Sequence, residues 1–180
     1  MERLTESEEI VADPRVGFPS DEFEAERMLL ARAQGRVGAI PPEILVAHVL
    51  RITAGAEWPV RQQAMEALLR RSAKVKEEDL RVATGPEGGA VAGPSATRRY
   101  RGRPSPYHMF LHGVSPLRGS CDCRDFLRNS LGVCKHLLTV LESLASRPRR
   151  WEKALREPAE DRELPGLGWD PVAPLAGPDD

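Results

Sequence analysis

Residues 121–136 read CDCRDFLRNSLGVCKH, a stretch that holds all three cysteines of the 180-residue chain and one of its four histidines. The order is Cys121-x-Cys123, ten residues, then Cys134-x-His136. Three thiols and one imidazole form the complete donor set of a structural zinc site, and four protein ligands leave no position for a reactive water. The stretch therefore predicts that these four residues bind Zn²⁺ and hold a small fold together.

This ligand spacing also constrains the local backbone. Residues two apart on a straight strand stand about 6.5–7 Å apart, too far for two thiolates on one zinc with bonds of about 2.3 Å. We therefore expect a bend at Cys121–Cys123, and a helix from about Cys134 to Ser146 that brings the second pair together. The residues between the pairs are expected to form a loop or short strand, with three apolar side chains under the site: Phe126, Leu127 and Leu131.

Other uses of the cysteines remain open. They could be buried as small apolar side chains, or Cys121 and Cys123 could form a redox pair. A Cys134 nucleophile with His136 as its base is a weaker alternative, because no third group is placed to orient the histidine. A disulfide framework is disfavoured by the odd cysteine count.

The rest of the chain predicts an α+β protein: a small helical domain, a small zinc-stabilised module and disordered termini. Apolar periodicity predicts helices over 21–34, 41–52 and 59–75, followed by a short helical turn at 77–82. Asp21, with Glu24 three residues later, is expected to be the N-cap of the first helix. His48 is expected at the edge of this helical core. Alternating patterns predict strands over 98–101, 106–112 and 117–123. The domain organisation is thus 1–19 disordered, 20–83 helical, 84–96 a Gly/Pro-rich linker, 97–146 the zinc module, and 147–180 a basic then acidic, proline-rich tail.

Charge is distributed unevenly along the chain. Residues 97–156 carry 13 basic and 4 acidic side chains, whereas residues 157–180 carry 1 basic and 7 acidic ones. A basic block indicates an anionic partner, because arginine forks match phosphate geometry. The candidate nucleic-acid contacts are Arg98, Arg99, Arg101, Arg103, Arg118, Arg124, Arg128 and Lys135. A second basic cluster follows the last helix: Arg147, Arg149, Arg150, Lys153 and Arg156. His108 and His112 lie about 13 Å apart on a strand and are expected to face solvent or nucleic acid.

The pattern Cys-x-Cys, spacer, Cys-x-His over residues 98–145 resembles the SWIM-type zinc finger. The flanks agree with this resemblance: a tyrosine-containing strand at 107–111, Phe126 after the second cysteine, and Cys134-Lys135-His136-Leu137 opening an apolar helix. The resemblance implies a β-β-α zinc module that binds DNA or proteins. The version associated with bacterial Swi/Snf-type helicase-like ATPases is the most similar.

These observations combine into a functional expectation. The chain is expected to bind nucleic acid, DNA with low sequence preference, as the front part of a helicase-like ATPase or an accessory to one. The alternative is a protein-interaction adaptor that docks an acidic surface, including the chain's own tail. We expect no catalytic activity, no small-molecule substrate, no membrane partner and a cytoplasmic, nucleoid-associated location, since no phosphate loop, catalytic set, secretory signal or apolar span is evident.

Overall fold

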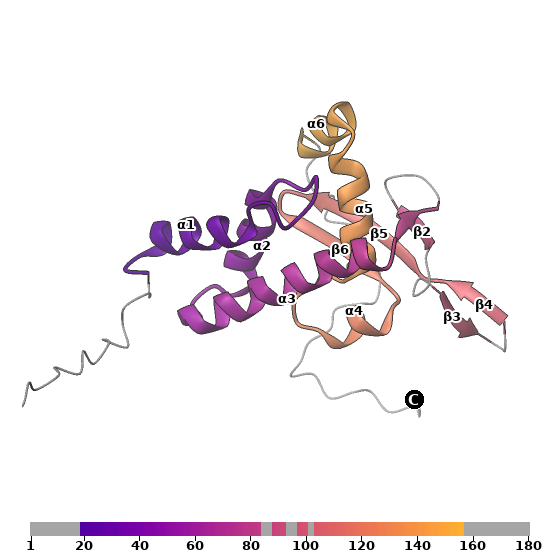
Figure 1. Cartoon of the computed structure of the whole chain (residues 1–180), viewed down its shortest axis with the longest axis horizontal. Coiled ribbons are helices and arrows are strands. Elements are labelled where there is room, and N and C mark those ends of the chain that lie inside the picture. Colours follow the sequence, from indigo (N-terminus) through magenta and orange to yellow (C-terminus); the bar gives the residue numbers. More distant parts are fainter. Residues whose placement is uncertain (1–18, 84–87, 93–96, 101–102, 157–180) are drawn as a thin grey trace, which may run out of the picture.

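A computed structural model describes residues 19–83, 88–92, 97–100 and 103–156. In this part of the chain, helices cover one face of a small antiparallel sheet (Figure 1), which confirms the α+β class. The termini expected to be disordered, 1–18 and 157–180, lie outside the described residues. None of the described helices combines the length and apolar character needed to cross a membrane.

Three helices form the N-terminal layer: α1 (Glu22–Ala33), α2 (Pro42–Ile52) and α3 (Trp58–Glu77). Asp21 caps α1 as predicted, because its carboxylate accepts a hydrogen bond from Glu24 N at 2.8 Å. Proline occupies the first turn of α2 and of α3, where no backbone N–H is needed. The three helices pack on one another through their apolar sides.

The sheet has the strand order β1-β2-β5-β6. The strands are β1 (Arg81–Val82), β2 (Gly88–Ala92), β5 (His108–Val114) and β6 (Leu117–Cys121). A separate hairpin joins β3 (Thr97–Tyr100) and β4 (Arg103–Pro106) at the right of Figure 1. The strands expected at 98–101, 106–112 and 117–123 are therefore present, with ends shifted by at most two residues.

Two predictions on the connecting segment are wrong. The expected helical turn at 77–82 is replaced by the end of α3 and strand β1. The middle of the expected linker at 84–96 is strand β2, which pairs with β1 on one side and β5 on the other. Glycine and alanine suggested a flexible segment by composition, but the edge of β5 offers a row of backbone partners, and pairing with it overrides that local tendency.

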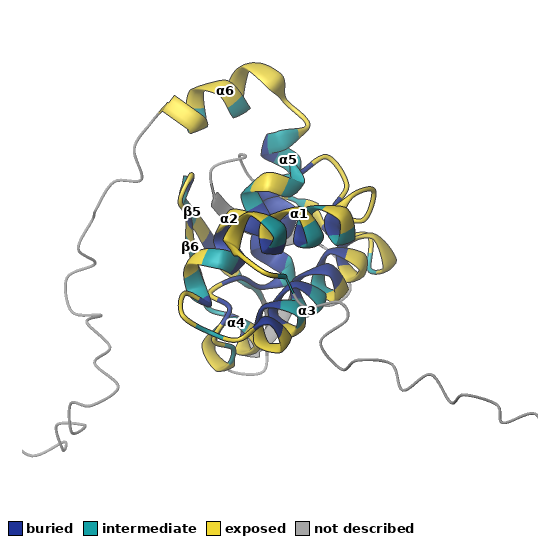
Figure 2. Ribbon diagram, turned by 90° about the vertical axis from the view of Figure 1, so that its left-hand side faces the viewer, coloured by how far each residue is buried: buried dark blue, intermediate teal, exposed yellow. Residues whose placement is uncertain are grey.

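Helix α5 (Lys135–Ala145) joins the two halves of the molecule. It packs on α3 on one side and on the sheet on the other, so its buried residues lie nearly all around it (Figure 2). The buried apolar side chains of α1–α3, α5 and the sheet form a single core. The helical part and the part that carries the Cys/His cluster therefore share one core, where the sequence predicted two domains separated by a linker.

Two short helices were not expected. Helix α4 (Arg124–Arg128) replaces the loop or strand between the ligand pairs. Leu131 is buried and Phe126 packs on the core, but Leu127 is 71% exposed, so its predicted place under the site is wrong. Helix α6 (Pro148–Arg156) occupies the start of the predicted tail. It packs on α5 and β5 with Trp151 turned toward the core.

Candidate metal centre

Four ligand atoms converge at the junction of three elements. Cys121 ends β6, Cys123 precedes α4, Cys134 precedes α5, and His136 lies in the first turn of α5. Their ligand atoms all lie within 4.8 Å of one another, and all four residues are at least 95% buried. These residues could hold a metal ion, as the spacing predicted.

The backbone bends between the first two cysteines, which confirms the expected geometry. Asp122 N donates to the carbonyl of His108 at 3.2 Å, and the Asp122 carboxylate accepts from His108 N at 2.9 Å. Strand β6 ends at Cys121, and α4 begins at Arg124. Cys123 then acts as the N-cap, with its Sγ accepting from Phe126 N at 3.3 Å. Both sulfur atoms are thus turned to the same side.

The second pair is positioned by the start of α5. Cys134 has an extended backbone and its carbonyl accepts the first helical hydrogen bond, from Leu138 N at 3.1 Å. His136 Nδ1 lies 3.8 Å from Cys121 Sγ, so this nitrogen faces the thiols. The other nitrogen, Nε2, is buried without a hydrogen-bond partner among the described residues. The imidazole lies beside the ring of Tyr107, with centroids 5.0 Å apart.

A glycine allows α5 to approach the sheet beside the cluster. A Cβ added to Gly119 of β6 would lie 2.9 Å from Leu137 Cδ2 and 2.9 Å from the carbonyl oxygen of Phe110. The Leu137 side chain could turn aside, but the Phe110 carbonyl belongs to the backbone of the neighbouring strand β5. A larger residue at Gly119 would therefore disturb the pairing of β5 with the strand that ends at Cys121.

The thiols strongly perturb one another. Hydrogen bonding with Cys123 raises the pKa of Cys121 to about 12. The same sharing with the other two thiols, together with burial, raises the pKa of Cys134, while donation from Cys121 and Cys134 lowers the pKa of Cys123. Each ionised thiol of the cluster therefore disfavours the ionisation of its neighbours. Three thiolates in this buried space require a cation, which is the chemistry of a metal site.

The helical layer supports the loop between the ligand pairs. His48 Nε2 donates to the carbonyl of Leu131 at 2.7 Å, and Arg51 donates to both His48 Nδ1 and the carbonyl of Leu117. Burial lowers the pKa of His48, in agreement with a neutral ring that donates through Nε2. The sequence placed His48 at a core edge, but nothing local could reveal that its partner lies 83 residues away.

Two ion pairs attach the ligand-bearing helices to α3 and its C-terminal end. Arg71 of α3 forms two hydrogen bonds with the Asp125 carboxylate of α4, at 2.7 and 3.0 Å. Lys135 Nζ binds the Glu78 carboxylate at 2.6 Å and is half-buried. Lys135 was predicted as a nucleic-acid contact. In the structure its ammonium is instead engaged within the protein, because the packing of α5 on α3 brings Glu78 to it.

The remaining predicted nucleic-acid contacts fall into three groups. Arg118, Arg124 and Arg128 are exposed on β6 and α4. Arg98, Arg99 and Arg103 lie on the β3–β4 hairpin, where the structure describes the backbone course, and Arg101 lies outside the described residues. In the second basic cluster the five cations are exposed at α6 and just before it: Arg147, Arg149, Arg150, Lys153 and Arg156. His108 is exposed, and His112 Nε2 lies 3.2 Å from Ser120 Oγ, so neither histidine belongs to the metal cluster.

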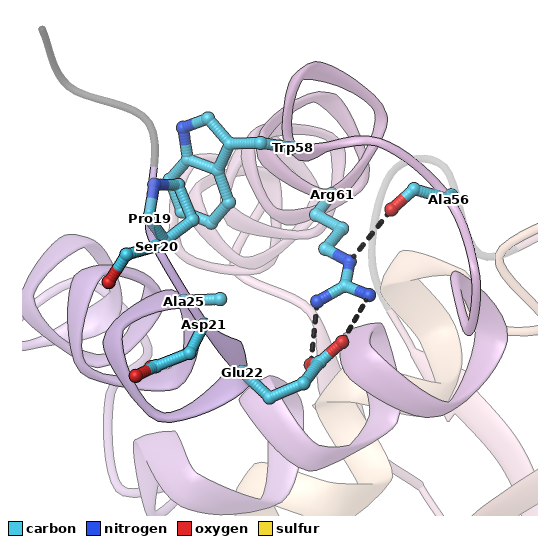
Figure 3. Close-up of a pocket in the computed structure, with 8 residues that line it drawn as sticks. All are labelled: Pro19, Ser20, Asp21, Glu22, Ala25, Ala56, Trp58 and Arg61. Carbon is cyan, nitrogen blue, oxygen red and sulfur yellow. Dashed lines mark hydrogen bonds and ion pairs between the residues drawn. The ribbon is translucent and has the colours of Figure 1, made fainter. Parts of the chain in front are cut away.

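A pocket on the helical layer does not involve the metal cluster (Figure 3). At its base Arg61 binds the Glu22 carboxylate through two hydrogen bonds of 2.6 Å and the carbonyl of Ala56 at 3.1 Å. The guanidinium thus joins α1 to α3 and to the turn before α3. Because the Arg61 donors already bind groups of the protein, we assign this pocket to the packing of α1 against α3 and not to a ligand.

Comparisons with known proteins identify no relative of this chain. No protein-family model matches it, no curated protein matches it, and no solved structure matches it.

Proposed function

We propose that this chain is a SWIM-type module that binds one zinc ion through Cys121, Cys123, Cys134 and His136 and binds DNA with little sequence preference. The observation that carries the proposal is the convergence of four buried soft and borderline donors within 4.8 Å. Magnesium and calcium prefer oxygen donors, whereas three thiolates and an imidazole suit zinc. When bound, the ion would supply a structural crosslink between β6, α4 and α5.

The chain's own residues favour a structural role for this site. Four ligands close a tetrahedral coordination shell, so no position is left for a substrate or water. The helical layer adds rigidity from outside, because Arg71 holds the start of α4 and Lys135 holds the start of α5. Ligands fixed in this way lose little conformational entropy on binding.

The exposed cations support nucleic acid as the partner. Arg124 and Arg128 lie on α4 directly beside the cluster, and Arg118 lies on β6. Arginine binds phosphate with paired hydrogen bonds and does so without reading the base sequence. The resemblance to the helicase-associated SWIM version supports an accessory role beside a helicase-like ATPase.

Native mass spectrometry of the purified full chain tests the metal. We expect one zinc per chain, lost in His136→Ala and retained in the matched variant His108→Ala, which removes an exposed histidine outside the cluster. A chain with no metal and three freely reactive thiols would contradict the proposal and favour the redox alternative.

A salt-titrated DNA-binding assay tests the partner. We expect Arg124→Gln and Arg128→Gln each to weaken binding to any duplex sequence and to lower the slope of log K against log salt by about one. Arg27→Gln, an exposed cation on α1, is the matched control and should leave the slope unchanged. A zinc-loaded chain that binds no DNA at low salt would reject this function and leave the protein adaptor.

A further inference from the structure

The outer face of the sheet carries an aromatic ring turned away from the core. Met109 of β5 is fully buried toward α5, and the next residue, Phe110, is 54% exposed on the opposite face. An exposed apolar residue alone means little, because such residues are common on protein surfaces. The neighbours of Phe110 give it significance.

The cross-strand partners of Phe110 are small or polar. Its partner on β2 is Gly88, which has no side chain, and its partner on β6 is Ser120. His112 reaches the same face, since its Nε2 lies 3.2 Å from Ser120 Oγ. The outer face therefore presents an aromatic ring, and beside it a hydroxyl and an imidazole that can form hydrogen bonds with a ligand.

Positive charge borders this face. Arg118 lies two residues from Ser120 on β6, so it points to the same side of the sheet, and it is exposed. Helix α6 contacts β5 and lies away from the three-helix layer (Figure 2). Its sequence PRRWEKALR contributes four exposed cations and only one carboxylate, Glu152, which pairs with Arg156 at 3.8 Å.

We propose that this outer face, composed of Phe110, His112, Arg118 and Ser120, binds single-stranded DNA by stacking a base on the Phe110 ring. The inference rests on the proposed function and deepens it by naming the form of DNA and the surface that holds it. Stacking needs an unpaired base, because the bases of a duplex are already stacked on one another. The cations of Arg118 and α6 match the phosphates that flank such a base.

Fluorescence anisotropy with the zinc-loaded full chain tests this inference, using labelled dT20 and a 20-base-pair duplex at one fixed salt concentration. Phe110→Ala should weaken binding to dT20 by about tenfold, and Phe110→Trp should retain it, because the larger ring still stacks. Duplex affinity should change by less than about twofold in both variants. The matched control is Leu127→Ala, which removes an exposed apolar side chain from α4 and should alter neither affinity.

The remaining outcomes separate this inference from the proposed function. If the wild-type chain binds neither DNA, both proposals fail. If it binds DNA in a salt-dependent way but Phe110→Ala has no effect, or weakens both DNAs equally, only the stacking surface is rejected. Equal affinity for polyglutamate and dT20 would reject DNA as the ligand and indicate an acidic protein. Binding of rU20 that is tighter than that of dT20 and depends on Phe110 would reject DNA and indicate RNA. Unchanged metal content and circular dichroism of Phe110→Ala exclude a folding defect as the cause.

Discussion

His48 Nε2 donates a hydrogen bond of 2.7 Å to the carbonyl oxygen of Leu131, across 83 residues of sequence. This bond joins the helical layer to the loop between the two ligand pairs. Both groups are buried, so neither can exchange its partner for water. The helical layer therefore takes part in shaping the metal centre.

Removal of the His48 ring should destabilise the whole fold. His48→Ala leaves the Leu131 carbonyl unpaired and creates a cavity, and we expect the free energy of unfolding to fall by about 2–4 kcal/mol. His48→Gln can still donate from its side-chain amide and should recover part of the loss. Denaturant unfolding of the two variants measures the difference. Equal stability of His48→Ala and the wild type would contradict the role of this bond.

The same histidine predicts a pH dependence of stability. Burial lowers the pKa of His48 in the folded chain, while in the unfolded chain it stays near about 6.5. As pH falls below about 6.5, the unfolded chain takes up a proton that the folded chain does not, so the free energy of unfolding decreases. The difference in stability between wild type and His48→Gln should therefore shrink or reverse between about pH 7.5 and 5.5. If the difference in stability between wild type and His48→Gln were constant with pH, the lowered pKa of His48 would be disproved.

Removal of the proposed metal ion should affect both halves of the molecule. From the sequence, Cys134→Ala is expected to unfold the zinc module and leave the helical domain intact. The structure predicts a different result, because α5 begins directly after Cys134, carries His136 and also packs on α3. A chelator should lower the thermal midpoint by about 10 °C or more, in one transition that includes the N-terminal helices. Separate melting of an unchanged helical domain would favour the two-domain interpretation.

Metal binding should release protons. The pKa of Cys121 is raised to about 12 and that of Cys134 is also raised, so both are protonated in the metal-free fold at neutral pH. Both must become thiolates to bind a metal. Calorimetry at about pH 7.5 in buffers of different ionisation enthalpy should therefore give about two protons released per zinc, with affinity rising as pH rises. Release of no proton would show that the thiols are already ionised.

Gly119 should resist substitution. In Gly119→Ala the new methyl group would lie 2.9 Å from Leu137 Cδ2 and from the Phe110 carbonyl oxygen. Because the backbone oxygen cannot move easily, we expect a loss of about 1–3 kcal/mol and weaker metal binding. Ser120→Ala, on the other face of the same strand, is the control and should cost less. Thermal unfolding of both variants compares them, and equal losses would exclude the close approach as the cause.

The sequence by itself determined the local features of this protein. The clustering of Cys121, Cys123, Cys134 and His136 could be predicted from their spacing, because donors within sixteen residues need only a bend and a helix start to converge. The three N-terminal helices and α5 were predicted from apolar periodicity, and the Asp21 cap from its position. These features depend on residues close together in the sequence, so the pattern of a short stretch is enough to predict them.

Only the tertiary structure decided how the parts combine. Strand β2 forms because β5 offers it backbone partners, although its Gly-rich sequence indicated a linker. Lys135 was predicted to face nucleic acid, but the packing of α5 on α3 places Glu78 at its ammonium. The bond from His48 to Leu131 and the close approach at Gly119 also arise between segments far apart in sequence. Such contacts depend on the relative position of whole helices and strands, which the single core fixes and which no local spacing encodes.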